Sequence, residues 1–136
     1  MCWITFVKPV KKVAKEDIKV YKILRKYGNR ITSPVRKTME WEIGKLVDLR
    51  KPLYYRGGNI CNAWILKEGF HSLIDCPVLV PTYCGKEWTI EKNDKCLFQC
   101  DRGESVYECV IPAGSTYYEN EYGEVVSDRL IVLKKC

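Results

Sequence analysis

The sequence predicts an α+β protein in which one or two short helices accompany a small, mostly antiparallel, strongly twisted sheet or split barrel. Short segments that alternate apolar and polar residues recur along the chain, and glycine and proline clusters separate them. Segments with a sustained helical period are few. The 136 residues have the size of one domain, and residues 1–16, which show no sustained period, are predicted to form its N-terminal arm.

The first clear strand is DIKVYKIL, residues 17–24. Its alternation predicts that Ile18 and Val20 face a core while Lys19 and Lys22 face water, as in a half-buried strand. A loop with a Gly-Asn turn is expected after it, over residues 26–34.

The middle of the chain leaves more alternatives open. Residues 35–49 fit a strand that ends in a turn at Gly44 or a short helix, and the glycine favours the strand. Residues 51–62, rich in turn formers, are predicted to be a surface loop. Residues 74–84 are apolar but contain Pro77 and Pro81, so a single helical turn is expected there rather than a long central strand.

The second half of the chain is more clearly β. Residues 87–91 and 96–100 are short alternating segments, and residues 105–111, SVYECVI, form a strong strand. A Pro-Ala-Gly-Ser turn ends that strand, and RLIVL, residues 129–133, is the expected closing strand.

Composition and charge are those of a soluble globular chain, with 46% apolar and 29% charged residues. The formal net charge is +6, and many basic residues lie among the first fifty, which favours anionic partners; a solvated, solubilising surface is the alternative. No signal peptide or membrane-spanning segment is recognisable, so we expect a cytoplasmic protein without a membrane partner.

Eight cysteines would suggest a disulfide framework in a secreted chain, but without an export signal reduced thiols are expected. Structural zinc requires closely spaced pairs of ligands, and only Cys96 and Cys100 have such spacing. We therefore predict no metal site. Cys109, inside an apolar run, is predicted to be a small buried residue.

The common catalytic motifs are absent, and no cofactor or catalytic residue is predicted. The single histidine, His71, lies in GFHSL, residues 69–73. We expect it to close a central strand and form local hydrogen bonds, the alternative being that it faces a ligand pocket beside Ser72. A Cys-His dyad would need one particular cysteine near His71, and the sequence singles out none.

The segments VYKIL, GFHSL and SVYECVIPAGSTYY followed by RLIVL resemble small proteins encoded by phages and mobile elements of gut bacteria, over residues 17–135. This resemblance implies a viral accessory protein in the cytoplasm of the host cell, with a counter-defence role: it would sequester a nucleotide signal of host immunity.

More remotely, NEYGEVVSDRLIVL, residues 120–133, resembles the final motif of ADP-ribosyltransferases. The resemblance implies that Glu121 orients a nicotinamide ribose, that Arg25 grips the cofactor and that Ser72 occupies a position in the middle strand. Gly123 and Glu124 interrupt the apolar strand of that family, and its His-Gly or Arg-Gly pair is missing. Binding is therefore a stronger expectation than catalysis.

We predict a non-catalytic binding protein for an anionic, nucleotide-type ligand, in which arginines grip phosphate and tyrosines stack on a base. The predicted ligand-binding residues are Arg25, Arg30, Arg36, Tyr54, Tyr55, Arg56, His71, Ser72, Tyr117, Tyr118 and Glu121. The alternatives are an ADP-ribosyltransferase-like enzyme and a protein-interaction module that inhibits a host enzyme through an exposed edge strand and a tryptophan anchor, which could be Trp3, Trp41, Trp64 or Trp88. Nucleic acid ranks below these partners, and a homo-oligomer fits either the binding protein or the interaction module.

Overall fold

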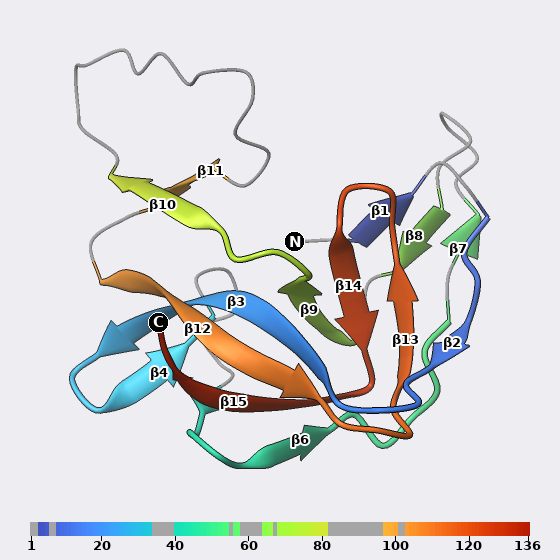
Figure 1. The fold of residues 1–136 in the computed structure, drawn as a ribbon, viewed down its shortest axis with the longest axis horizontal. Helices are drawn as coiled ribbons and strands as arrows, with labels where there is room; N and C mark the ends of the chain where they lie inside the picture. Colours follow the sequence, from blue (N-terminus) through green and yellow to red (C-terminus); the bar gives the residue numbers. More distant parts are fainter. Residues whose placement is uncertain are drawn as a thin grey trace.

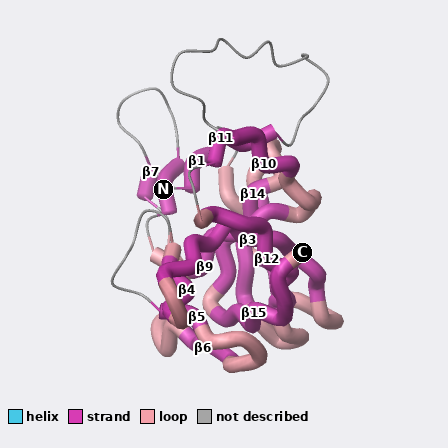
Figure 2. Tube along the Cα trace, turned by 90° about the vertical axis from the view of Figure 1, so that its left-hand side faces the viewer, coloured by secondary structure: helices cyan, strands magenta, loops and turns pink. Residues whose placement is uncertain are grey.

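The computed structural model describes most of the chain, in the ranges 3–5, 8–33, 40–54, 56–57, 64–66, 68–81, 97–100 and 103–136. Within these ranges every regular element is a β-strand, and Figure 2 accordingly shows strands and loops without a helix. The predicted α+β class with one or two helices is therefore wrong for the described part of the chain. That part also contains no helix long and apolar enough to cross a membrane.

The helical turn expected within residues 74–84 illustrates the error. Val78–Pro81 is a strand, β10, which pairs in parallel with β11, Leu97–Cys100. Pro77 precedes β10 and Pro81 ends it, so neither proline interrupts the middle of the strand. Residues 82–84, and the strand expected at 87–91, lie outside the described residues.

Ten strands form one antiparallel sheet, whose main path runs β2-β13-β14-β9-β3-β12-β15-β6, with β4 on β3 and β5 on β4. In that order, their bounds are Lys12–Val13, Thr116–Glu119, Glu124–Ser127, Phe70–Leu73, Ile18–Tyr27, Glu104–Ile111, Arg129–Lys135 and Leu46–Asp48, then Arg30–Thr32 for β4 and Glu40–Trp41 for β5. The strands expected at 105–111 and 129–133 are confirmed as parts of β12 and β15, and the strand expected at 17–24 is confirmed as β3 from Ile18 onward.

A smaller sheet combines β1, Trp3–Thr5, with β8, Trp64–Leu66, and β7, Arg56–Gly57. Figure 1 shows it on the side of β13 and β14, whereas β10 and β11 lie beyond β9. The residues expected to form an N-terminal arm thus supply β1 and the edge strand β2, both of which pair with later parts of the chain.

Strand β3 is the middle of the large sheet and pairs with β4, β9 and β12. Val20 and Leu24 on it are completely buried, as a strand with one face on the core requires. Lys22 shares their face rather than the water-facing side predicted for it. Its ammonium reaches the edge of the core, where it donates a 2.7 Å hydrogen bond to the carbonyl of His71 and lies 5.4 Å from the centre of the Trp41 ring.

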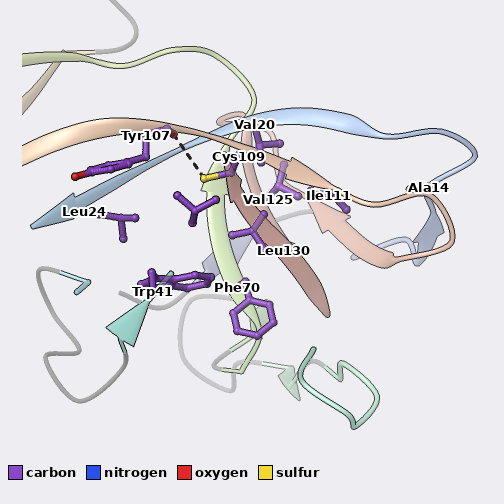
Figure 3. Close-up of a cluster of buried hydrophobic side chains, with 11 residues drawn as sticks. Ala14, Val20, Leu24, Trp41, Phe70, Tyr107, Cys109, Ile111, Val125 and Leu130 are labelled. Carbon is purple, nitrogen blue, oxygen red and sulfur yellow. Dashed lines mark hydrogen bonds between the residues drawn. The ribbon is translucent and has the colours of Figure 1, made fainter. Parts of the chain in front are cut away.

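The main core lies on this face of the sheet, and Figure 3 shows its side chains gathered below the blue ribbon of β3 and the orange ribbon of β12. Trp41 and Phe70 meet edge to face, with ring centroids 5.5 Å apart. Trp41 is only 4% exposed, so it packs in the core and does not present an anchor to a protein partner. The core comprises Ala14, Val20, Leu24, Trp41, Phe70, Tyr107, Cys109, Ile111, Val125, Leu130 and Val132.

Cys109 is buried as predicted, with its thiol 3.6 Å from the carbonyl oxygen of Tyr107. Burial raises the pKa of this thiol from 9.0 to about 12. The folded state therefore keeps the neutral thiol, and the stability that this provides is present below about pH 9 and is lost as the pH rises toward 12.

We expect this loss to reach about 2 kcal/mol near pH 10.5. In Cys109→Ala, which has no thiol to ionise, the free energy of unfolding should fall less steeply from about pH 9 to about pH 10.5. Urea unfolding of both proteins at several pH values measures the difference, because the lysines and tyrosines that also titrate there are common to both. If the free energy of unfolding fell equally steeply with pH in both proteins, the raised pKa of the Cys109 thiol would be contradicted.

Candidate functional site

A cleft of about 380 Å³ opens where the chain after β6 passes the start of β13. Figure 1 shows these two segments at its lower right. Four separate parts of the chain form it: the segment before β2, the end of β6 with the loop that follows, the first residue of β13, and the residue between β14 and β15. The lining residues are Lys11, Asp48, Arg50, Lys51, Pro52, Leu53, Thr116 and Asp128.

Asp128 holds three of these parts together. Its backbone N–H donates to the carbonyl of Thr116 (3.1 Å), and its carbonyl accepts from the N–H of Leu49 (2.8 Å). Its carboxylate accepts a further bond from the N–H of Thr116 (3.0 Å). The start of β13 and the loop after β6 are therefore fixed to the same residue.

Arg50 has the most unusual backbone of the cleft, with φ at 59°. Among the described residues it is the only one other than glycine with a positive φ, a conformation that costs an L-residue roughly 1–2 kcal/mol. Its N–H donates to the Asp48 carboxylate at 2.8 Å, in a local Asx-type turn that maintains the conformation. Backbone strain of this kind concentrates at binding and catalytic sites.

The charges of the cleft favour an anion. Three basic side chains face two carboxylates, and each carboxylate already accepts a backbone N–H. Lys51 pairs with Glu68 at 3.0 Å, outside the set of lining residues. Within the described part of the chain, neither Lys11 nor Arg50 forms an ion pair. These two cations are thus available to a ligand.

Arg50 also borders a second hollow, of about 470 Å³, on the side of β5 and β6. Its other lining residues include Glu40, which pairs with Arg30, and Glu42, which pairs with Lys45. Acidic side chains outnumber basic ones there, so the first cleft is the better anion site.

The predicted arginines lie elsewhere. Arg25 is on β3, with its guanidinium 4.8 Å from the centre of the Tyr27 ring. Arg30 forms a salt bridge with Glu40. Arg36 and Tyr55 lie outside the described residues. Arg56 belongs to β7, and its side chain is not among those described.

His71 and Ser72 are neighbours in the middle of β9, so their side chains point to opposite faces of the sheet. His71 pairs with Val126 of β14 and accepts the Lys22 ammonium at its carbonyl. Ser72 lies on the core face and is 5% exposed. The strand therefore places on opposite faces the two side chains that were expected to share a pocket. The expectation that His71 closes the strand is also wrong, because β9 ends at Leu73.

Glu121 lies in the turn between β13 and β14, where its carboxylate accepts a 2.5 Å hydrogen bond from the hydroxyl of Thr5. Leu73 of β9 pairs with both Glu124, next to this turn, and Tyr21 of β3. Arg25 lies four residues further along β3, toward the β3–β4 turn. The sheet does not bring Arg25 and Glu121 together.

Among the predicted tyrosines, Tyr54 is the one beside the cleft. It follows the lining residue Leu53 and is 55% exposed. Tyr118 is buried in a small second cluster with Leu53 and Val126, and Tyr117 packs against the main core. Tyr118 therefore packs against the cleft-lining residue Leu53, and neither tyrosine lines the cleft itself.

Sequence reasoning missed Lys11, Arg50 and Lys51 as site residues. One local signal was present, because an aspartate two residues before Arg50 favours an Asx-type turn. No local sequence pattern indicates that four distant segments of the chain meet at this cleft. Among the described residues, no group of three or more His, Cys, Asp or Glu side chains is placed to hold a metal ion.

Comparison of the chain with protein-family models, with curated proteins and with solved structures gives no match.

Proposed function

We propose that this protein is a binding protein for a small anionic ligand, held in the cleft by Lys11 and Arg50. The observation that carries the proposal is the strained backbone of Arg50, which fixes an arginine without an ion pair among the described residues at the cleft. A guanidinium grips phosphate through two parallel hydrogen bonds. The volume of about 380 Å³ is within the usual range of small-molecule sites.

The remaining lining residues support a nucleotide-type ligand. The carboxylates of Asp48 and Asp128 retain acceptor capacity beyond the single N–H that each binds, so they can accept from ribose hydroxyls or a base amine. Pro52 and Leu53 supply an apolar wall, and exposed Tyr54 follows them in the chain. Sequestration of a nucleotide signal, which rests on the resemblance to phage proteins, remains a prediction within this proposal.

The first test is thermal stabilisation of the protein by NAD, ADP-ribose, mononucleotides and cyclic di- and trinucleotides, with inorganic phosphate and short DNA and RNA as comparisons. A ligand at one hundred times its Kd should add about 2.7 kcal/mol, a shift of several degrees. We expect a selective shift with one nucleotide class. A flat panel would overturn the proposal and direct attention to a protein partner.

Arg50→Gly separates binding from folding. Glycine adopts the positive φ without strain and retains the N–H that Asp48 accepts, so the melting temperature should stay or rise. Loss of the guanidinium should weaken binding about tenfold to a hundredfold. Lys26→Gln removes one exposed charge from β3 and serves as the control, which should bind like the original protein. Unchanged affinity in Arg50→Gly would exclude this cleft.

Arg25→Gln distinguishes the cleft from the arginine set predicted by the sequence. If the ligand occupies the cleft, this variant should bind normally, because Arg25 is on β3 beside Tyr27. Loss of binding in Arg25→Gln but not in Arg50→Gly would place the site at the β3–β4 turn instead. Titration of both variants by calorimetry with the ligand found in the panel decides between them.

A further inference from the structure

The large sheet ends on one side in β6, which pairs with β15 alone among the described residues. The N–H of Leu49 donates to the carbonyl of Asp128 at 2.8 Å and continues the ladder between β6 and β15. Because successive residues of an antiparallel strand direct their backbone groups to opposite sides, Leu46 and Asp48 direct theirs away from β15. Figure 1 shows β6 at the lower margin of the sheet, with β15 above it. The N–H groups and carbonyls of Leu46 and Asp48 therefore form an edge to which a further strand can add.

The second hollow, of about 470 Å³, borders this edge. All three residues of β6 line it, together with Glu40 of β5 and with Glu42, Lys45 and Arg50. Leu46 is 45% exposed, so an apolar side chain is accessible beside the free backbone groups. An extended segment placed against β6 would therefore find partners for both its backbone and its side chains.

The charge of the second hollow contrasts with that of the chain. Three carboxylates and two cations line it, although the chain has a formal net charge of +6. Glu40 pairs with Arg30 and Glu42 pairs with Lys45, and all four side chains are more than half exposed. Exposed ion pairs of this kind contribute little to stability. A cationic side chain of a partner can therefore take the place of Arg30 or Lys45 at these carboxylates.

We propose that β6 and the second hollow bind an extended basic peptide segment of a protein partner, which adds one strand to the large sheet. The backbone of the peptide pairs with Leu46 and Asp48. Alternate side chains of the peptide point into the hollow, where lysines or arginines meet Glu40 and Glu42. This partner differs from the small anion of the first cleft, because it carries the opposite charge and binds mainly through its backbone.

The test uses the intact chain and the synthetic peptide acetyl-Thr-Lys-Val-Lys-Val-Lys-Thr-amide, with amide hydrogen exchange followed by NMR. With the peptide at ten times its Kd, exchange of the Leu46 and Asp48 amides should slow about tenfold. Val13 of the opposite edge strand, β2, is the internal control. Its N–H points away from β13, because the neighbouring Ala14 donates to Ser115. Unchanged exchange at Leu46 and Asp48 with about 1 mM peptide, or equal slowing at Val13, would overturn the proposal.

Two changes in the peptide separate strand addition from charge attraction. The same peptide with glutamate in place of lysine should bind at least about tenfold more weakly, because it brings carboxylates to Glu40 and Glu42. Methylation of the backbone nitrogens should be made in two versions, on the lysines or on the valines. One version should bind about tenfold more weakly, because only one set of N–H groups faces β6. Equal affinity of the acidic peptide, or unchanged affinity of both methylated peptides, would contradict the proposal.

Variants of the protein test the carboxylates. Glu40→Gln combined with Glu42→Gln should weaken binding of the basic peptide about tenfold, whereas Glu16→Gln, an exposed position outside the hollow, should not. The melting temperatures should agree within about 2 °C, because exposed ion pairs add little stability. Unchanged binding in the double variant would count against recognition by charge. Slow exchange at Leu46 and Asp48 without peptide, increasing with protein concentration, would assign the hollow to a second copy of the chain and overturn the proposal.

Discussion

Replacement of Gly69 by alanine should lower the free energy of unfolding by about 2–4 kcal/mol, because both the backbone and the space around it exclude a side chain. Gly69 has φ at 107°, a region that L-residues rarely adopt. A Cβ there would lie 2.5 Å from Cγ1 of Val126 and 2.8 Å from Cδ2 of Leu53. Real Cβ atoms do not approach other atoms so closely, so the small cluster around Leu53 must shift.

Gly28→Ala is the matched control, because Gly28 also has a positive φ, 55°, but nothing lies within 4 Å of the Cβ position. It should cost about 1 kcal/mol, the backbone contribution alone. Urea unfolding of both variants gives the comparison. Equal losses would show that the packing of Val126 and Leu53 against Gly69 does not limit this position.

Gly69→Ala also links stability to the cleft. Leu53 is a cleft-lining residue as well as a member of the cluster with Tyr118 and Val126. A shift of Leu53 should therefore weaken ligand binding in the fraction that stays folded, although Gly69 does not line the cleft. The glycine of GFHSL accordingly has a clear structural role, as the residue that immediately precedes β9.

Much of the sheet could be predicted because alternation is a local property. The strand at 105–111 shows it plainly: Tyr107, Cys109 and Ile111 are buried and alternate with less buried residues. The turn at Pro112–Ser115 followed from residue types, and Gly114 there has φ at 86°. Local sequence was thus sufficient wherever a strand had one face on the core.

The errors arose where pairing partners decide the structure. Val78–Pro81 lacks alternation and resembles a helical turn until β11 pairs with it, and that pairing spans residues far apart in the chain. Lys22 was assigned to water by its charge, yet a carbonyl and an aromatic ring at the edge of the core accommodate it. Neither neighbour can be identified from local sequence.

The candidate site was harder still to predict. Its cations come from residues 11, 50 and 51, which meet because β2 pairs with β13 and because Asp128 joins the start of β13 to the loop after β6. The left-handed backbone of Arg50 follows from one side-chain hydrogen bond to Asp48, and arginine itself has no preference for that conformation. Composition directed attention to anions, but it could not select which basic residues converge.

Leu130→Ala should destabilise the protein by about 2–5 kcal/mol, because it removes a completely buried side chain and leaves a cavity in the main core. Leu133→Ala, three residues along the same strand, should cost less than about 1 kcal/mol. Leu133 is the extra residue of the bulge and is 40% exposed. Both variants make the same chemical change in β15, so the difference in their unfolding midpoints measures burial alone.

This pair of variants tests the register on which the rest of the structure depends. A slip of β15 by one residue would turn Leu130 away from the core, and it would also displace Asp128 from Thr116 and Cys136 from Val106. Comparable losses in the two variants would therefore contradict the pairing of β15 with β12 and β6, and with it the geometry of the cleft. A large loss confined to Leu130→Ala would mean that β15 is positioned by its buried face.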